Sequence, residues 1–226
     1  MTKAVTKRIK RNDFIFKRLK ELITILRKIN DLKLTIFQQM KLISRLIFFY
    51  ILGWKIENDF PKDLKKYLII AAPHTSSMDF PIGIMTKFIL GVDIKFIGKH
   101  TLFKPPFGFI FRALGGTPVD RSKSTNMVQA LIDIFNEKED FIFALSPEGT
   151  RKRTVKWKTG FYHVAIGADV PIVMAAIDFG NKKVTIEKPY YLSKDQETDF
   201  KYFHRYFKDI KGKNPDQFEP NFNRNL

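Results

Sequence analysis

Two kinds of hydrophobic pattern alternate along most of this chain. The first is a compact apolar run of strand length, found at 67–72, 94–98, 141–145 and 171–177. The second is an apolar pattern with helical spacing, found at about 80–90, 125–137 and 159–167. Residues 184–187 predict a further strand, at an edge. Strands that alternate with helices predict an α/β fold with a mostly parallel sheet flanked by helices.

The first 54 residues follow a different pattern. Apolar residues recur at spacings of four and three over 15–29, with Lys and Arg on the other face, and a second helical stretch at 36–54 includes the apolar run 46–53. Such a segment can lie in a membrane interface, or it can pack on a neighbouring domain as a helix pair. We favour the first interpretation, and divide the chain into a membrane-associating helical segment, 1–54, and a second domain, 55–226.

Charge narrows the classes of partner. The net charge of +17 favours nucleic acid, an acidic membrane surface or phosphorylated molecules, and the first 60 residues hold 14 Lys and Arg against 5 Asp and Glu. The absence of Cys excludes a disulfide, a thiolate zinc site and a cysteine nucleophile. No secretory signal is visible, and no apolar stretch reaches the roughly 20 residues of a membrane-spanning helix.

The first candidate for chemistry follows the strand predicted at 67–72. His74 is separated by four residues from Asp79, at the end of a strand, where sites of α/β proteins form. A neutral imidazole can take the proton of an attacking hydroxyl, and a carboxylate on its other nitrogen fixes the tautomer and stabilises the imidazolium. The alternative is that Asp79 only caps the following helix, although capping and catalysis are compatible.

Other histidines and serines fit less well. His204 and Asp209 have the same spacing, but His204 lies in an amphipathic helical pattern, and we interpret it as a packing or surface residue. His100 and His163 lack the acidic partner and are expected to be structural. Ser76 and Ser77 are expected to cap the helix, because the chain has no G-x-S-x-G nucleophile elbow.

Two glycine-containing blocks carry cations. Residues 115–121 contain two glycines that permit a tight turn and end in Arg121, whose planar fork suits phosphate. Residues 146–151 read Ser-Pro-Glu-Gly-Thr-Arg and follow the strand predicted at 141–145; basic residues continue to Lys158. An ordinary turn and a solvated basic loop are the simpler explanations for each block alone.

The order of these blocks resembles that of the glycerolipid acyltransferase family, the PlsC-like or 1-acylglycerol-3-phosphate acyltransferase type. The motifs H-x4-D, G-x-x-x-x-D-R, F-P-E-G-T-R and V-P-I-x-P of that family have counterparts here, in order, over roughly residues 45–190. Ser146 stands where the family often has an aromatic residue, and Ala175 or a neighbour replaces the last proline. These departures leave open which lyso-lipid is used.

The resemblance implies an acyltransferase domain at 55–226 with a glycerol-phosphate acyltransferase-like fold. It implies transfer of a fatty acyl group from acyl-CoA or acyl carrier protein to a lyso-glycerophospholipid in phospholipid biosynthesis, with 1-acylglycerol-3-phosphate as the expected acceptor and phosphatidic acid as the product. His74 would be the general base and Asp79 its partner. The residues implied to bind the acceptor are Lys99, Arg121, Glu148, Gly149, Thr150 and Arg151. No metal or cofactor is implied.

Lipid substrates also imply a peripheral, monotopic position, expected on the cytoplasmic face of the cell membrane, with an anionic membrane surface as a partner. Acylation of another lyso-lipid, such as an amino-acid lipid, is the alternative within the enzyme class. A basic nucleic-acid-binding protein fits the charge, but no nucleic-acid motif is present, and we expect no nucleic-acid partner. The intact His74 and Asp79 argue against a lipid-binding relative without catalysis.

Overall fold

A computed structural model describes residues 31–32, 35–119 and 127–219. The chain divides into two units, 1–43 and 44–226. In the first unit, the described residues from 35 to 43 are helical, and the second unit opens with a π-helical turn, η1 (Leu46–Ile51). Over the described ranges, no helix combines the length and the apolar character needed to cross a membrane. The basic pattern at 15–29 lies outside the described residues, so its membrane association stays a prediction.

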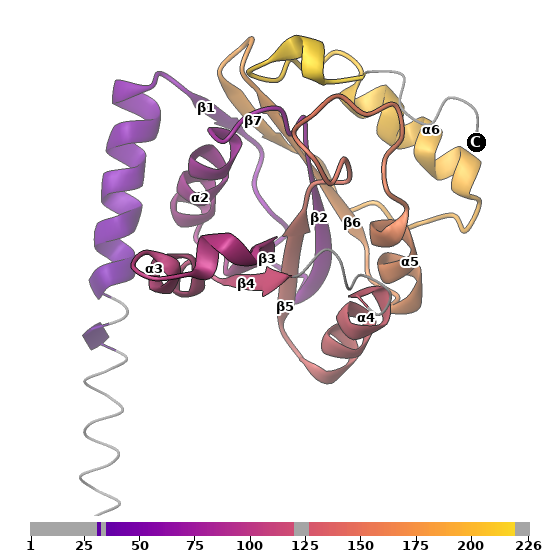
Figure 1. Ribbon diagram of the computed structural model, residues 1–226, viewed down its shortest axis with the longest axis horizontal. Helices are drawn as coiled ribbons and strands as arrows, with labels where there is room; N and C mark the ends of the chain where they lie inside the picture. The colour runs from indigo at the N-terminus through magenta and orange to yellow at the C-terminus, as the bar shows by residue number, and fades with distance from the viewer. Residues whose placement is uncertain (1–30, 33–34, 120–126, 220–226) are drawn as a thin grey trace, which may run out of the picture. The chain divides into compact units, whose positions relative to one another are not determined.

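The second unit is built on a seven-stranded sheet with the order β1-β7-β6-β2-β5-β3-β4 (Figure 1). Its strands are β1 (Lys55–Glu57), β2 (Lys66–Ala72), β3 (Ile94–Lys99), β4 (Gly116–Val119), β5 (Phe141–Leu145), β6 (Ile172–Asp178) and β7 (Lys183–Ile186). Every neighbouring pair is parallel except β6 and β7. The prediction of a mostly parallel sheet flanked by helices is therefore confirmed.

Two short strands were not predicted, and they change where the sheet ends. β1 pairs with β7 on its outer side, so the prediction that residues 184–187 form an edge is wrong. β4 occupies the block that was interpreted as a turn, and it pairs with β3. Pro118 is tolerated there because an edge strand has a side that needs no N–H donor. Strands of three and four residues are too short to give a hydrophobic pattern.

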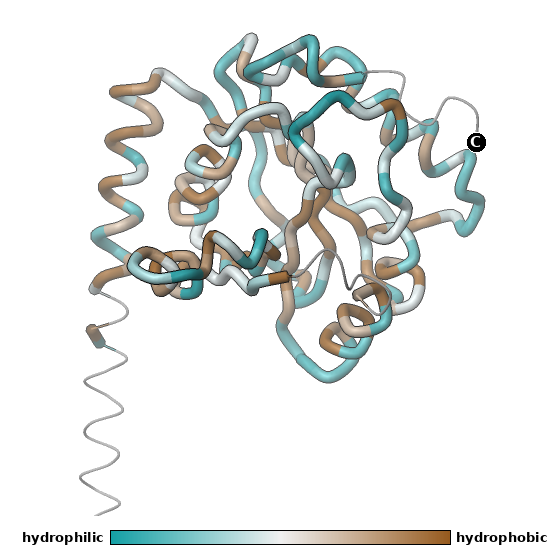
Figure 2. The backbone as a smooth tube through the Cα atoms, viewed as in Figure 1, coloured by the Kyte–Doolittle hydropathy of each residue, from teal (hydrophilic) through white to brown (hydrophobic). Residues whose placement is uncertain are grey.

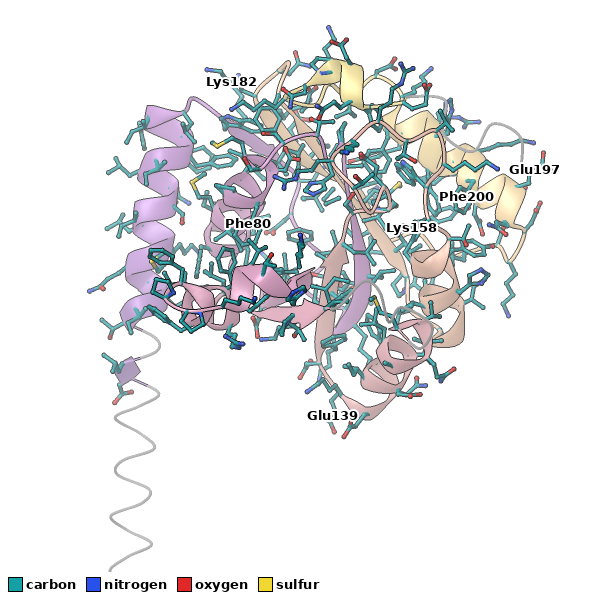
Figure 3. All side chains as sticks on the ribbon, in the orientation of Figure 1. Phe80, Glu139, Lys158, Lys182, Glu197 and Phe200 are labelled. Atoms are coloured by element: carbon teal, nitrogen blue, oxygen red, sulfur yellow. The ribbon has the colours of Figure 1, made fainter. Side chains whose placement is uncertain are left out.

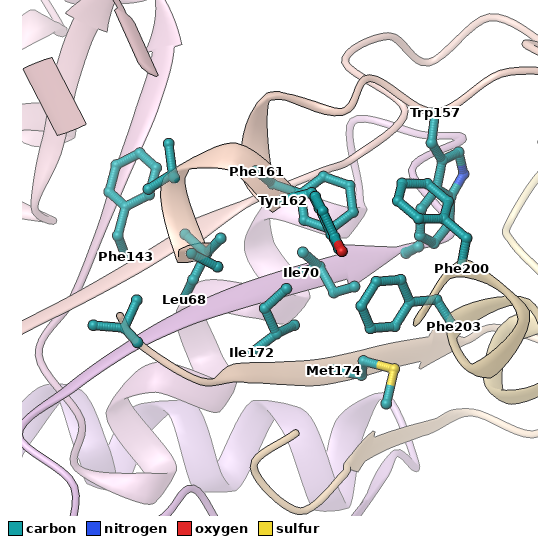
Figure 4. Packing of buried hydrophobic residues seen from close by; sticks show 14 of the residues in the cluster. Leu68, Ile70, Phe143, Trp157, Phe161, Tyr162, Ile172, Met174, Phe200 and Phe203 are labelled. Atoms are coloured by element: carbon teal, nitrogen blue, oxygen red, sulfur yellow. The ribbon is translucent and has the colours of Figure 1, made fainter. Parts of the chain in front are cut away.

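Helices cover both faces of the sheet, as Figure 1 shows. They are α2 (Asp79–Leu90), α3 (Gly108–Ala113), α4 (Met127–Glu137), α5 (Gly160–Gly167) and α6 (Gln196–Phe207), with short 3-10 turns η2 (His100–Phe103) and η4 (Pro215–Gln217). Side chains alternate between faces along β2: Leu68 and Ile70 join one core cluster, and Tyr67 and Ile69 join the other. The first cluster, drawn in Figure 4, is rich in aromatic residues of α5 and α6.

The apolar run 46–53 is partly core. Phe48 is fully buried and packs against Trp54, with ring centroids 5.8 Å apart. Leu46, Tyr50 and Ile51 are exposed. The side of this run that carries Phe48 therefore packs on the domain, and the opposite side remains exposed. A helical turn buries only the side chains that face its neighbour.

Candidate active site

The candidate site lies at the carboxyl end of β2. Pro73 and His74 follow this strand directly, and the block from Ser146 follows its parallel neighbour β5, so the two segments meet at one edge of the sheet. A cavity of about 470 Å³ opens there. Its wall is mostly apolar, with contributions from Ala71, Phe96, Ile97, Leu131, Phe161 and Ala175. His74, Asp79 and Lys158 also line it, so a titratable pair and a cation face an apolar space.

His74 and Asp79 are in contact. His74 Nδ1 lies 3.0 Å from Asp79 Oδ2; the imidazole is one-third exposed (33%) and the carboxylate is buried (4%). This contact assigns the ring proton to Nδ1 and leaves Nε2 as the basic nitrogen. The geometry thus matches the base and its orienting carboxylate in hydrolases and transferases that activate a hydroxyl.

Asp79 also organises the start of α2. Its Oδ2 accepts the backbone N–H of Ser76 (2.9 Å), and Ser76 Oγ accepts the backbone N–H of Met78 (3.2 Å). These two bonds order the turn that precedes α2, whose N-cap residue, Met78, makes no side-chain cap bond. One carboxylate oxygen of Asp79 therefore contacts both the loop that precedes α2 and the imidazole of His74. The other oxygen, Oδ1, is buried without a hydrogen-bond partner in the described part of the chain.

Glu148 contacts the backbone of His74 and is not among the residues that line the cavity. Its carboxylate is only 3% exposed, and Oε1 accepts the backbone N–H of His74 at 2.7 Å. Burial raises the pKa of Glu148 from 4.5 to about 7, and the hydrogen bond from His74 opposes part of that rise. The side chain predicted to shape the glycerol site thus contacts the backbone that carries His74.

The remaining residues of this block form a turn at the same edge. Gly149 has φ +65°, a conformation that favours glycine, and it lines the cavity beside Lys158. Thr150 Oγ1 accepts the backbone N–H of Lys152 at 3.1 Å. Arg151 is exposed, as is Lys99 at the end of β3, the strand next to β5. Both cations lie at the carboxyl edge of neighbouring strands, and Arg121 lies outside the described residues.

Lys158 was not singled out from the sequence as a candidate residue. It precedes α5 (Figure 3), and its backbone N–H donates to the carbonyl of Pro147 at 2.9 Å. In the sequence it is one of several cations after Arg151, and nothing in their spacing separates it from the others. Only the return of the loop to the sheet edge places it on the cavity wall.

The C-terminal segment also reaches the histidine loop, which the sequence did not indicate. Thr75 is buried; its hydroxyl accepts the backbone N–H of Asn214 (3.2 Å), and its carbonyl accepts the Asn214 side-chain amide (2.8 Å). The amide of Gln217, oriented to satisfy its neighbours, donates to the carbonyls of Thr75 (2.8 Å) and Arg151 (2.7 Å). At Gly212 a Cβ would lie 2.5 Å from Thr75 Oγ1, so the segment approaches the loop closely.

His204 lies on α6, while His100 and His163 are exposed, and none of the three lines the cavity. In the part of the chain that the structure describes, no group of three or more His, Asp or Glu could hold a metal ion. His204 lies in α6 and Asp209 follows that helix, so this second pair with the same spacing does not follow a strand of the sheet.

Comparison with known proteins agrees with this arrangement. A model of the acyltransferase family matches residues 54–178, which is more than half of the chain. This chain belongs to the acyltransferase family. The match covers the described candidate residues from His74 to Arg151, and it ends before the C-terminal segment that contacts Thr75.

The acyltransferase has several curated relatives. It is 28% identical to the 1-acyl-sn-glycerol-3-phosphate acyltransferase of Escherichia coli (strain K12) over 144 residues, which is 60% of this chain and 58% of the relative. It is 29% identical to the protein of that name from Salmonella typhimurium over 145 residues, again 60% and 58%. The chain therefore spans about three fifths of the length of these relatives.

A solved structure shares the fold. The crystal structure of the 1-acyl-sn-glycerophosphate (LPA) acyltransferase PlsC from Thermotoga maritima aligns with a TM-score of 0.55 and 22% identity, over 75% of this chain and 76% of that chain. This likeness supports the glycerol-phosphate acyltransferase-like fold expected from the motif order. Because the sequence identity is low, the likeness is evidence for the fold alone.

Proposed function

We propose that this acyltransferase transfers a fatty acyl group from acyl-CoA or acyl carrier protein to the free hydroxyl of 1-acylglycerol-3-phosphate, forming phosphatidic acid. The observation that carries the proposal is the 3.0 Å contact between His74 and Asp79 at the wall of an apolar cavity. A base that is oriented by a carboxylate suits a hydroxyl acceptor, and an apolar space suits a fatty acyl chain. The names of the curated relatives support the choice of acceptor.

The contacts suggest the following step. His74 Nε2 takes the proton of the acceptor hydroxyl as the oxygen attacks the thioester carbonyl. The C–S bond then breaks, and the leaving thiolate takes the proton from the imidazolium. Asp79 holds the ring through Nδ1, and a carboxylate at this position stabilises the imidazolium that forms. No residue of the protein is acylated in this sequence.

The acceptor phosphate needs cations at the same edge. We assign Lys99, Arg121 and Arg151 to this role, with Gly149 and Thr150 in the turn that borders the acceptor. An Arg fork can hold a phosphate through two parallel hydrogen bonds. Lys158 is added to this set because it lines the cavity together with His74. For Glu148 the contacts support a positioning role through the His74 backbone.

The proposed acceptor and product are both lipids, which favours a position at a membrane. We propose a peripheral position on the cytoplasmic face of the cell membrane, with the basic residues 1–54 facing anionic lipid. Each Lys or Arg near such a surface contributes about 1 kcal/mol. The proposal needs no metal and no resident cofactor, since the acyl donor is a substrate.

A direct assay tests the proposed function. Purified protein is incubated with radiolabelled acyl-CoA or acyl carrier protein and a panel of lyso-lipids that includes 1-acylglycerol-3-phosphate and a lyso-amino-acid lipid. We expect labelled phosphatidic acid to form, and none to form with His74→Ala. Equal or faster acylation of the amino-acid lipid would identify that lipid as the acceptor instead. Absence of any acyl transfer by the folded protein with both donors would contradict it.

A further inference from the structure

The segment between β3 and β4 carries exposed apolar side chains beside the site. Leu102, Phe107, Phe109 and Ile110 are exposed, with Phe107 at 64% and Phe109 at 69%. We call these four residues the α3 surface; Figure 2 shows the hydrophobic colour along α3. Phe107 and Ile110 are three residues apart and therefore share a helical face. Large aromatic residues exposed in a group indicate an interaction surface.

The other aromatic residues of this segment point inward and fix the α3 surface to the site. Phe103 and Phe111 pack together, with ring centroids 5.9 Å apart, and Phe111 packs against Phe80 at 5.6 Å. Phe80, labelled in Figure 3, follows Asp79 in the chain. Its ring centroid lies 5.2 Å from that of Phe96, and it lines the cavity. The outward residues are thus held on a packed aromatic base, because the inward residues already fill the space against the sheet.

Glycine and arginine tighten the same segment. At Gly108 a Cβ would lie 2.0 Å from the carbonyl of Phe103, so η2 and α3 can meet only with glycine there. Arg112 donates to that carbonyl at 3.0 Å. These contacts keep Phe107 and Phe109 outside, since a tightly joined turn leaves no room for their rings to fold inward.

Charge indicates which partner fits. No residue from 94 to 119 is acidic, whereas Lys99, Lys104 and Arg112 are basic and exposed. Aromatic and aliphatic side chains surrounded by cations are complementary to the interface of an anionic lipid layer, where apolar groups enter the acyl region and cations remain at the headgroups. A surface that pairs with a protein would be expected to include acidic residues as well.

We infer that the α3 surface inserts into an anionic lipid bilayer and brings the cavity entrance beside His74 to the membrane. The inference rests on the proposed function in that the acceptor is a membrane lipid, and it adds a contact separate from residues 1–54. Gly98 lines the cavity, and a Cβ there would lie 3.5 Å from Leu102 Cδ1, so the lipid-facing segment borders the cavity itself.

A local probe tests this insertion in the full-length protein. Phe109→Trp places an indole on the α3 surface, and Tyr191→Trp places one at an exposed site after β7 as the matched control. The native Trp54 and Trp157 are buried, and the wild-type spectrum is subtracted. With phosphatidylglycerol vesicles that carry brominated acyl chains, we expect quenching and a blue shift for Phe109→Trp and neither for Tyr191→Trp.

A second pair of variants measures the contribution of the surface. Phe107→Ser with Phe109→Ser should weaken partition into phosphatidylglycerol vesicles by about tenfold or more, while Tyr191→Ser leaves it unchanged. Acylation of a short-chain, monomeric acceptor should stay near wild type in both. An unquenched Phe109→Trp on vesicle-bound protein, or an unchanged partition of the Phe107→Ser and Phe109→Ser double variant, overturns the inference. Failure of the wild type to acylate the monomeric acceptor would contradict the proposed function. The quenching result would still test whether the α3 surface inserts into the bilayer.

Discussion

The side-chain amide of Asn214 donates to the backbone carbonyl of Thr75 at 2.8 Å, although 139 positions separate the two residues. The backbone N–H of Asn214 also donates to the Thr75 hydroxyl. Thr75 follows His74, so the C-terminal segment fixes the loop that presents the imidazole. Asn214 lies beyond the region that the family model matches, so the contact predicts a positioning residue outside the shared motifs.

Removing the Thr75 hydroxyl should impair positioning without removing the base. Thr75→Val removes the acceptor of the Asn214 N–H, a part-buried hydrogen bond of about 0.5–1.5 kcal/mol, and we expect kcat to fall by up to about tenfold with little change in KM. Thr75→Ser keeps the acceptor and should retain most of the activity. Lys213→Ala, an exposed neighbour of Asn214, is the control for changes in this segment. Equal kcat in Thr75→Val and Thr75→Ser, at unchanged Tm, would show that the contact has no positioning role.

The proposed base is tested by single substitutions in the His74–Asp79 pair. His74→Ala removes the base, and Asp79→Asn keeps the shape but loses the charge that stabilises the imidazolium; each should lower kcat by roughly 10²–10⁴. His204→Ala has the same sequence spacing to an Asp and should retain most of the activity, because α6 carries it away from the cavity. Circular dichroism checks that each variant is folded. Near-normal turnover in folded His74→Ala would rule out this base.

The order of the reaction gives an independent check. Because no residue of the protein is acylated in the proposed step, donor and acceptor must be bound together, and initial rates should give a sequential pattern with intersecting lines. Incubation with labelled donor alone should leave no acyl group on the protein. A stable acyl-protein adduct, or parallel double-reciprocal lines, would require a covalent intermediate instead.

Glu148 predicts a pH dependence of stability. Its pKa is 4.5 when exposed and about 7 in the fold because it is buried. The folded state therefore holds the proton more tightly, and this stabilisation, complete below pH 4.5, is lost as the pH rises through 7. Relative to Glu148→Gln, which cannot ionise, the free energy of unfolding of wild type should fall by about 3 kcal/mol across that range. Urea unfolding at several pH values measures it, with the exposed Glu139→Gln controlling for loss of a negative charge; a constant difference would contradict the burial effect.

The phosphate assignment predicts a selective change in KM. Arg151→Lys or Arg121→Lys keeps the charge but loses the two-pronged donor, so KM for the lyso-phospholipid should rise about tenfold while KM for the acyl donor changes little. Arg205→Lys, on the exposed side of α6, is the matched control. A rise in KM for the donor alone would show that these cations bind the phosphates of the acyl donor instead.

Much of the fold could be predicted because its signals are local. The apolar runs at 67–72, 94–98, 141–145 and 171–177 all became strands, since a strand buried on both faces must be apolar along its whole length. His74 and Asp79 could be paired from sequence because both lie in one loop, where a strand end and a helix start bring residues five apart into contact. The block at 146–151 could be placed at the same edge because parallel neighbours end together.

The sequence could not determine what depends on distant segments meeting. β1 and β4 were not predicted, because they are too short to show a hydrophobic period. β7 was wrongly expected to be an edge strand, because its pairing with β1 cannot be seen in the sequence. Glu148 was read as part of the acceptor site, but it is folding that places its carboxylate against the His74 backbone and removes it from water. Thr75 and Asn214 gave no signal, because a hydrogen bond between residues far apart leaves no pattern in either segment. Lys158 gave none because its place in the cavity wall depends on how the loop folds back. The sequence by itself determined the layers of the domain and the pairing of His74 with Asp79. Tertiary packing decided which residues surround and hold that base, because burial and the distances between loops exist only in the folded chain.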